Sequence, residues 1–473
     1  MNRIQIVLLL TIFFGAFIVR LYHINNPVAD WHSWRQADTA AVARNFLKFG
    51  FTPLQPRYDD LSNVQSGKDN PQGFRMVEFP IYQTMAVALY QLLKFFGGIS
   101  LEFCLRLISI LASMGIMFFL YDLVKKYSGF LAAISSAFIF GFLPYCIYYS
   151  RVILPEMLAV FWALGGIWIA LRFGISGKWR ILGMGIFAGL AILTKPMAGF
   201  LLVPFIYFWL KEFKANLYYF LRIIIFSVFA FAGFAWWRIW ILQYPEGIPA
   251  NEWLLNSGNI RFSGAYFYWL LGERLAKLIL GYWLVIPFLL GLISRSLQKS
   301  IVYLLLLIGT IFYAIVFARG NVQHDYYQII WLPVISIFVG LGIDYLINST
   351  NQLNRYLSII AVIVCIVVGI LFSWHDIRSY YWINNPAMVE AGLTVDRLTQ
   401  KNAKVIAPYG GDTAFLYQTN RQGWPVGFEI EKKIALGANY YVNTNVKDLE
   451  TQYVLKRWTP LVVNDRFVIV KLK

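Results

Sequence analysis

The sequence predicts an all-helical polytopic membrane bundle followed by a small α/β soluble domain at the C-terminus. Of the 473 residues, 59% are hydrophobic and only 14% are charged, whereas a soluble domain carries about 25% charged residues. Apolar runs long enough to cross the hydrocarbon core of a bilayer recur along most of the chain. We expect these runs to be helical, because lipid offers no hydrogen-bond partners to an open strand.

The apolar runs predict about 11 to 13 transmembrane helices. The first run follows Arg3 and lacks a small-residue cleavage site, so we expect an uncleaved first helix. If the N-terminus is inside and the C-terminal domain outside, these runs cannot all be single crossings, because there is one run too many. Either the second run is re-entrant, or the fourth run, which Pro144 interrupts, forms two short helices. The runs occupy residues 4–21, 81–99, 103–124, 129–149, 152–173, 180–194, 197–210, 220–242, 277–294, 301–318, 327–347 and 357–374.

The chain divides into two regions of different character. Residues 1–374 are expected to form a transmembrane module with a long polar outer loop at 22–80. Residues 375–473 mix polar and apolar segments and predict a small α/β domain. Its expected strands lie at residues 404–409, 438–442 and 461–472.

The net charge of +17 follows from the membrane topology and does not indicate nucleic-acid binding. The basic residues cluster in short loops between apolar runs, as the positive-inside rule requires of cytoplasmic loops. This pattern predicts a membrane protein with a cytoplasmic N-terminus and an extracytoplasmic C-terminal domain. The clusters are Lys125-Lys126, Lys178 with Arg180, Lys211 with Lys214, and Arg295 with Lys299.

This topology collects several polar segments on the outer face. They are the loop 22–80, Arg151–Glu156, Lys195 and His324–Tyr327. A loop of this length in a compact protein is usually functional. The sequence contains no Walker loop, dinucleotide-binding glycine pattern or zinc spacing, and its three cysteines give no metal-binding pattern. Nothing therefore indicates a nucleotide-sugar substrate.

The outer loop is expected to contain a polar helix. Ser33 and Gln36 have the spacing of a capping box, which predicts a helix start at Ser33, and Gly50 predicts its end. On this helix one face carries Arg35, Asp38, Thr39 and Val42, at positions i, i+3, i+4 and i+7. One interpretation is an interfacial helix with an Arg35–Asp38 pair, which contributes a few tenths of a kcal/mol. The other is a functional surface.

Several segments resemble bacterial membrane glycosyltransferases of class C (GT-C), whose relatives include protein O-mannosyltransferases and lipid A aminoarabinose transferases. The resemblance covers about residues 1–375, and the order and outward placement of the segments carry it. The segments are His32-Ser33-Trp34-Arg35-Gln36-Ala37-Asp38-Thr39 with Ala43-Arg44-Asn45-Phe46, Glu78-Phe79-Pro80-Ile81-Tyr82, Tyr149-Ser150-Arg151 with Leu154-Pro155-Glu156, and Leu193-Thr194-Lys195-Pro196.

The resemblance implies a polyprenyl-phosphate-linked sugar donor. A carboxylate in the first outer loop would deprotonate the acceptor hydroxyl, and basic residues would neutralise the leaving phosphate. Many relatives carry Asp-Glu where this chain has Arg35-Gln36. The base must therefore come from Asp38, Glu78 or Asp30, ranked in that order.

Further substrate-binding residues are expected on the outer face. Arg35, Lys195 and Arg151 are candidates for the donor phosphate, and Glu156, His324 and Tyr327 for the sugar or acceptor. His32 could act as a base or bind the phosphate. The structural alternatives are a solvated Glu78 at a helix start, an Arg151–Glu156 ion pair, a snorkelling Lys195, an aromatic belt at the tyrosines and a solvated His32.

The sequence indicates no definite cofactor, and a divalent cation is possible: Asp59, Asp60 and Asp69 could bind one, or they could be solvated loop acids. The predicted function is transfer of a sugar, with inversion, from a polyprenyl-phosphate carrier to a hydroxyl of a glycan, lipid or protein at the outer membrane face. The main alternative is a transporter or flippase of an envelope polysaccharide or lipid, whose usual signature is inverted repeats with broken helices. A non-catalytic scaffold is a third interpretation.

Overall fold

The computed structural model describes residues 2–294, 300–348 and 354–473. Two compact units can be distinguished. The helical unit comprises Met1–Ile24, Arg106–Arg238 and Asn251–Ser379, and the loop–tail unit comprises Asn25–Leu105, Ile239–Ala250 and Tyr380–Lys473. This grouping differs from the division expected at residue 374, because the first outer loop packs with the C-terminal domain.

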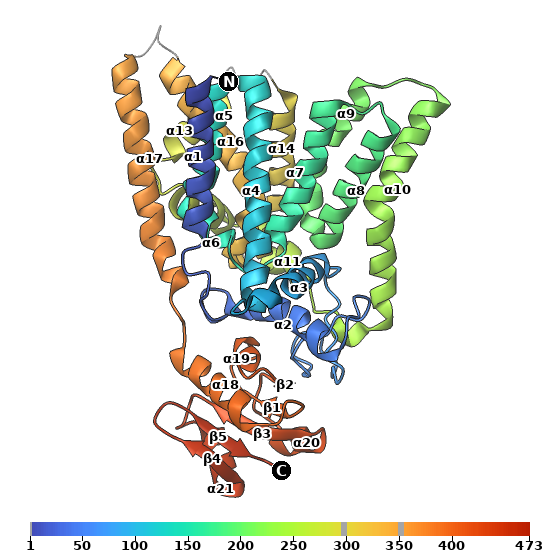
Figure 1. The fold of residues 1–473 in the computed structure, drawn as a ribbon, viewed down its shortest axis with the longest axis vertical. Helices are drawn as coiled ribbons and strands as arrows, with labels where there is room; N and C mark the ends of the chain where they lie inside the picture. The colour runs from blue at the N-terminus through green and yellow to red at the C-terminus, as the bar shows by residue number, and fades with distance from the viewer. Residues whose placement is uncertain (1, 295–299, 349–353) are drawn as a thin grey trace. The chain divides into compact units, whose positions relative to one another are not determined.

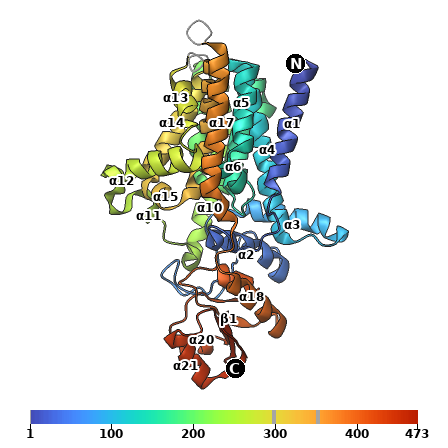
Figure 2. The same ribbon diagram turned by 90° about the vertical axis from the view of Figure 1, so that its left-hand side faces the viewer.

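Long helices make up most of the helical unit. Figure 1 shows them running lengthwise beside one another, and Figure 2 shows them turned by 90°. Within it, α7 packs on α8, and α16 packs on both α5 and α13. Its helices are α1 (Arg3–Arg20), most of α4 (Leu101–Ser128), α5 (Phe130–Phe142), α6 (Pro144–Tyr149), α7 (Glu156–Phe173), α8 (Lys178–Thr194), α9 (Pro204–Lys211), most of α10 (Leu217–Trp240), α11 (Trp253–Asn256), α12 (Gly264–Phe267), α13 (Val285–Ile293), α14 (Ile301–Val316), α15 (Ala318–Gln323), α16 (Leu332–Asn348) and α17 (Arg355–Ile377).

Six helical segments among the described residues are long and apolar enough to cross a membrane, and two shorter apolar helices accompany them. Several other expected runs fold as shorter or broken helices. The exact number of crossings therefore stays a prediction, while the helical nature of the bundle is confirmed. The six are Arg3–Arg20, Leu101–Ser128, Glu156–Phe173, Leu217–Gln243, Asp325–Asn348 and Arg355–Leu398, and the shorter two are Phe130–Phe142 and Ile301–Val316.

The structure divides the run at 129–149 into two helices, which is one of the two alternatives for the surplus run, while a re-entrant second run stays a prediction. Helix α3 (Ile81–Leu93) has 13 residues and a length of about 20 Å, too short to cross a bilayer. The run at 129–149 is divided into α5 and α6, because Pro144 begins α6 and holds Leu143 in an extended conformation.

The expected run at 277–294 is not one helix. A π-helix ends at Ile279 and α13 begins at Val285. Between them Gly281 has φ of 52°, and a Cβ there would lie 1.9 Å from the carbonyl oxygen of Gly369. The chain turns here because only glycine permits both the left-handed backbone and this close approach.

The basic clusters of the helical unit gather at one end of α7. Lys126 donates a hydrogen bond to the carbonyl of Leu171, and Arg180 donates one to the carbonyl of Phe173. Glu156 begins the same helix at its opposite end. The basic residues and the candidate acid thus lie at opposite ends of α7, as the predicted topology requires. Arg295 and Lys299 lie outside the described residues.

The C-terminal part of the loop–tail unit contains a five-stranded sheet in the order β2-β1-β3-β5-β4. The expected strands at 404–409 and 438–442 are β1 (Lys404–Ile406) and β3 (Ala438–Asn443). The single strand expected at 461–472 is instead an antiparallel hairpin, because β4 (Thr459–Val463) and β5 (Val468–Lys471) pair with each other. The remaining elements are β2 (Gln422–Trp424) and the helices α18 (Pro386–Leu398), α19 (Ala414–Gln418), α20 (Ile430–Ala435) and α21 (Leu449–Arg457).

The first outer loop extends this sheet at the edge formed by β2. The N–H of Gly423 donates to the carbonyl of Asp59 at 2.9 Å, and the N–H of Leu61 donates to the carbonyl of Gly423 at 2.8 Å. The side chain of Leu61 joins the buried core of the sheet beside Ile406 and Trp424. The loop therefore satisfies backbone groups that an uncovered edge strand would expose.

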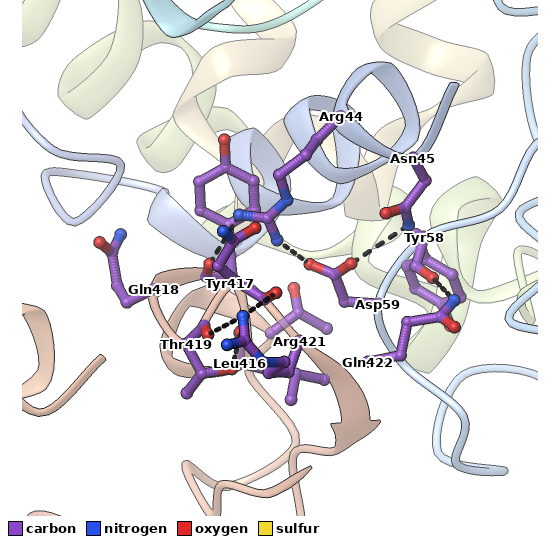
Figure 3. A network of polar contacts seen from close by, with 12 residues as sticks. Arg44, Asn45, Tyr58, Asp59, Leu416, Tyr417, Gln418, Thr419, Arg421 and Gln422 are labelled. Atoms are coloured by element: carbon purple, nitrogen blue, oxygen red, sulfur yellow. Dashed lines mark hydrogen bonds and ion pairs between the residues drawn. The ribbon is translucent and has the colours of Figure 1, made fainter. Parts of the chain in front are cut away.

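A buried polar network joins α2 (Ser33–Phe49) to α19 within the same unit (Figure 3). Arg44 of α2 forms an ion pair with Asp59, which also accepts a hydrogen bond from Asn45 at 3.2 Å. Arg44 also donates to the carbonyl of Tyr417 at 2.9 Å and lies over the Tyr417 ring. The Tyr417 hydroxyl donates to Glu102 at 2.5 Å. One guanidinium thus holds the first loop and the tail helix together.

Replacing Asp59 by Asn should strongly destabilise the protein. The change leaves the largely buried Arg44 cation without its counter-charge, and removing one partner of such a pair costs about 3 to 5 kcal/mol. Thermal unfolding of the purified protein measures the loss. The matched control is Glu431→Gln, since the Arg457–Glu431 pair is 57% and 60% exposed and is expected to contribute less than about 1 kcal/mol. Equal melting temperatures for the two variants would contradict the prediction.

Candidate functional site

Helix α2 begins and ends where the sequence predicts, but its start is not a capping box. The residue before Ser33 is His32, whose backbone is left-handed with φ of 54° and whose side chain makes no capping bond. Gln36 instead donates hydrogen bonds from Nε2 to Asp30 Oδ1 at 2.7 Å and to the Trp31 carbonyl at 3.0 Å. The expected capping box is wrong because Asp30 competes for the glutamine amide. Gly50 ends the helix with φ of 96°, as predicted.

A small polar pocket lies on the predicted face of α2. The four residues expected to share this face, Arg35, Asp38, Thr39 and Val42, all line it. The loop before α3 and the start of α3 form the rest of the pocket wall, and they add two charged side chains, Arg75 and Glu78. The other lining residues are Pro56, Val77, Pro80 and Gln83. The pocket therefore brings two carboxylates and two guanidinium groups together.

Asp38 is fully buried in this unit and is held on both carboxylate oxygens. Its Oδ2 forms an ion pair with Arg75 Nη2 at 2.8 Å and accepts a long hydrogen bond from Gln65 at 3.5 Å. Its Oδ1 accepts a hydrogen bond from the hydroxyl of Thr413 at 2.7 Å. Arg75 in turn donates to Gln65 and lies over the ring of Tyr58. The carboxylate thus has a fixed orientation.

Arg35 pairs with Glu78, at 2.7 Å between Nη2 and Oε1, and the two side chains are 8% and 11% exposed. The alternative of an Arg35–Asp38 pair is wrong, because Arg75 occupies that position. Glu78 is not a solvated residue at a helix start either. Asp30 is buried but does not line the pocket, and His32 is half-buried beside Trp31.

The loop acids considered as cation ligands have other environments. Asp59 is buried in its ion pair with Arg44. Asp60 is buried and accepts hydrogen bonds from the N–H of Ser62 at 2.7 Å and from the Tyr58 hydroxyl at 3.4 Å. Only Asp69 is exposed, so the interpretation as solvated loop acids is wrong for the first two. Among the described residues no group of three or more potential metal ligands was found.

In the helical unit the structure pairs Glu156 with Lys195. Their Oε1 and Nζ atoms lie 2.9 Å apart, and the side chains are 3% and 8% exposed. Lys195 directly follows the C-terminal end of α8, and Glu156 begins α7. Lys195 does not snorkel to solvent, and its close partner here is a carboxylate. Two buried charges of opposite sign at helix ends are costly to desolvate unless each neutralises the other.

The other expected residues of the helical unit are Arg151, His324 and Tyr327, and all of them have contacts within the unit. Arg151 is fully buried and donates to the carbonyl of His23 at 3.0 Å. His324 stacks on Tyr326 and Tyr327, with ring centroids 5.5 and 6.1 Å away. Both tyrosines are buried within the unit, so they do not form an exposed aromatic belt.

The comparisons with known proteins identify the fold. The family of dolichyl-phosphate-mannose-protein mannosyltransferases matches residues 83–240, while a search of curated proteins finds no match to the sequence. ArnT from Cupriavidus metallidurans, in a crystal structure bound to undecaprenyl phosphate, superposes with a TM-score of 0.64 at 13% identity and covers 100% of this chain and 98% of its own. The chain has the fold of the class C glycosyltransferases. The recognition made from the sequence is therefore confirmed.

Two further GT-C structures are similar over most of this chain. The archaeal oligosaccharyltransferase AglB from Archaeoglobus fulgidus, in complex with an inhibitory peptide and a dolichol-phosphate, has a TM-score of 0.58 at 11% identity and covers 94% of this chain and 70% of its own. The arabinofuranosyltransferase AftD from Mycobacteria has a TM-score of 0.54 at 14% identity and covers 100% of this chain and 41% of its own. At these identities the likeness establishes the GT-C fold with its helical membrane module and small α/β tail.

Three residues that contact Asp38 were missed in the sequence. Arg75 could have been found, because it is a charged residue of the polar loop only three positions before Glu78. Gln65 and Thr413 carry no comparable signal. Thr413 reaches Asp38 from 375 positions away, and only the tertiary fold brings such residues together.

Burial near the pocket raises the pKa of two neighbouring acids, Asp60 and Asp412. Burial, reinforced by the negative charge of Asp38, raises the pKa of Asp60 to about 6. Burial and Asp38 likewise raise the pKa of Asp412 to about 6. The pKa of Asp60 in the folded protein thus lies above the value of about 3.9 for an unfolded chain. The folded state binds more protons than the unfolded state between about pH 4 and 6, and it loses stability as the pH rises through that window.

Replacing Asp60 by Asn should therefore stabilise the protein at neutral pH. The amide keeps the oxygen that accepts from Ser62 and cannot ionise, so the free energy of unfolding at pH 7.5 should rise by up to about 3 kcal/mol. At pH 4 the gain should vanish. Thermal unfolding of the variant and the natural protein across this pH range measures the difference, with the exposed Asp69→Asn as the control. An effect of equal size at pH 4 and pH 7.5 would contradict the prediction.

Proposed function

We propose that this protein is a glycosyltransferase that moves a sugar from a polyprenyl-phosphate carrier to an acceptor hydroxyl of a glycan, lipid or protein. The observation that carries the proposal is the pocket on α2, where the buried Asp38 lies with Glu78, Arg35 and Arg75 in a chain with the GT-C fold. Solved structures with this fold hold undecaprenyl phosphate or a dolichol-phosphate. This supports a lipid-linked donor.

Asp38 is the proposed general base. Its carboxylate lies on the pocket face of α2, and Arg75 and Thr413 hold it in one orientation, which a base requires in order to meet a bound hydroxyl. Glu78 lines the same pocket and is paired with Arg35 as Asp38 is with Arg75, and it is the second candidate because it lies in the loop before α3 and not on the helix face of α2. Asp30 ranks third, since it lies outside the pocket lining and holds Gln36.

The proposed reaction is a single displacement. The proton of the acceptor hydroxyl passes to the Asp38 carboxylate while the hydroxyl oxygen bonds to the anomeric carbon. The bond between that carbon and the phosphate oxygen breaks, and its electron pair leaves with the carrier phosphate. Arg35, on the same pocket wall, is suited to stabilise the negative charge that develops on the phosphate. One displacement inverts the configuration at the anomeric carbon.

The remaining assignments stay predictions. Lys195 and Arg151 are predicted to bind the donor phosphate. The residues predicted to bind the sugar or acceptor are Glu156, His324 and Tyr327. His32 is predicted to bind the phosphate or to take part in proton transfer. We also propose a bacterial inner-membrane location with the N-terminus in the cytoplasm and the C-terminal domain outside. The gathering of basic residues at one end of α7, opposite to Glu156, supports this orientation.

Transfer should depend on Asp38 more than on the other two acids. We expect Asp38→Asn to lower kcat by about 10²- to 10⁴-fold, the range typical for losing a general base, and Glu78→Gln and Asp30→Asn to lower it less. The assay incubates the purified protein with a radiolabelled polyprenyl-phosphate sugar and acceptor extract, and it follows the label into product. Asp69→Asn is the exposed control. Full transfer by all three acid variants would refute the assignment, and movement of the carrier lipid across a vesicle without product would favour a flippase.

The product of the same assay reports the stereochemistry. A single displacement predicts that the glycosidic bond has the configuration opposite to that of the donor phosphate. Proton NMR of the anomeric centre in the isolated product, or digestion with glycosidases specific for each anomer, distinguishes the two. A product that retains the donor configuration would exclude the mechanism with one base and one displacement.

A further inference from the structure

The hydroxyl of Thr413 is used in an unusual way. Thr413 directly precedes α19, where a threonine hydroxyl typically accepts a hydrogen bond from an N–H of the first helical turn. It makes no such bond, and its backbone is already helical, with φ of −80° and ψ of −5°, while the Asp412 carboxylate accepts from the N–H of Ala414 at 2.7 Å. The Thr413 hydroxyl lies 2.7 Å from Asp38 Oδ1 and 3.2 Å from the carbonyl of Trp34, both on α2.

The turn that carries Thr413 is held rigidly. The N–H groups of Tyr409 and Gly411 both donate to the carbonyl of Pro425 at 3.0 Å, and the N–H of Asp412 donates to the carbonyl of Tyr409 at 3.0 Å. Gly410 and Gly411 have φ of 63° and 86°, a left-handed conformation that favours glycine. The backbone therefore fixes where the threonine hydroxyl lies.

Helix α19 is also anchored to the segment around α2. Gln418 donates to the carbonyl of Val28 at 2.8 Å, Arg44 donates to the carbonyl of Tyr417 at 2.9 Å, and Lys48 donates to the carbonyl of Asn420 at 2.8 Å. These bonds hold α19 at its C-terminal end, while Thr413, which lies just before the N-terminal end of α19, bonds to α2. The distance from Thr413 to Asp38 is thus maintained by several independent contacts within one unit.

Thr413 gives Asp38 a neutral hydrogen-bond donor, which the charged neighbours of Asp38 cannot provide. Those neighbours are Arg75, which pairs with Oδ2, and the titratable groups Tyr58, Asp60 and Asp412. The hydroxyl is a neutral donor to the other oxygen, Oδ1. A donor of this kind favours the ionised carboxylate over the protonated form and fixes the plane of the carboxylate.

We infer that Thr413 is the positioning residue of the general base, so that the C-terminal domain completes the catalytic site. This inference rests on the proposed function, in which Asp38 is that base. The tail domain then has a defined role in transfer: its β1–α19 turn orients the Asp38 carboxylate through the Thr413 hydroxyl. Hydrogen bonds from a neighbouring side chain to a reacting group set the geometry of that group.

The test compares four variants of the full-length protein in the transfer assay with labelled polyprenyl-phosphate sugar. Thr413→Val removes the hydroxyl and keeps the shape of the side chain. Thr413→Ala removes the hydroxyl and shortens the side chain, and Thr413→Ser keeps a hydroxyl at this position. The matched control is Thr419→Val, which removes a buried threonine hydroxyl at the other end of α19, where it bonds only the carbonyl of Leu416 at 2.7 Å. Kinetics are measured from pH 4.5 to 8.5.

Both hydroxyl-free variants should lower kcat by about tenfold, the effect of roughly 1.4 kcal/mol, and leave KM for the donor within about twofold. The acidic limb of the pH–rate profile should move to higher pH, because the carboxylate has lost a hydrogen-bond donor. Thr413→Ser should return both properties to those of the natural protein. Thr419→Val should change neither.

Two results separate the inference from the function beneath it. If Asp38→Asn is inactive while Thr413→Val and Thr413→Ala keep the natural kcat and pH profile, the role of Thr413 is refuted and Asp38 remains the base. If Asp38→Asn transfers sugar normally, the base assignment fails and the inference with it. A loss of kcat in Thr413→Ala that Thr413→Ser does not recover, with an unmoved pH profile, would also refute the positioning role.

Discussion

The pairing of the first outer loop with the edge of the C-terminal sheet is the constraint on which the loop–tail unit depends. Two backbone hydrogen bonds at Gly423 and the burial of Leu61 in the sheet core convert a long polar loop into part of a folded domain. An uncovered edge strand would expose unpaired donors and acceptors. Because the loop is held at this edge, α2 has a defined environment, and its polar face can form a pocket of fixed shape.

The loop–tail unit also buries an unusual number of charges. Asp38 lies against Arg75, and Asp59 against Arg44, while Asp60 is held by hydrogen bonds from the N–H of Ser62 and the hydroxyl of Tyr58. Burying such groups weakens the folded state unless each is compensated, and the raised pKa of Asp60 records incomplete compensation. Sites of perturbed titration tend to be functional. In the helical unit the buried Glu156 and Lys195 compensate each other's charge as an ion pair at two helix ends.

Local patterns in the sequence predicted the helices better than the contacts that their residues make. The face of α2 that carries Arg35, Asp38 and Val42 lines the pocket as its helical periodicity indicates, and Gly50 ends that helix. The capping box failed because Asp30, outside the helix, attracts the Gln36 amide. The run at 277–294 failed as a single helix because Gly281 packs against the backbone of Gly369, a contact that apolar composition does not reveal.

The sequence by itself determined the membrane-embedded helical fold, the small α/β tail and the pocket face of α2, because hydrophobicity and periodicity are properties of adjacent residues. Tertiary structure decided which charges meet: Arg75 with Asp38, Glu78 with Arg35 and Lys195 with Glu156. It also decided that Thr413 of the tail reaches the first loop. These partners lie tens to hundreds of positions apart, and many other pairings have the same local sequence signals. Only packing in three dimensions selects among them.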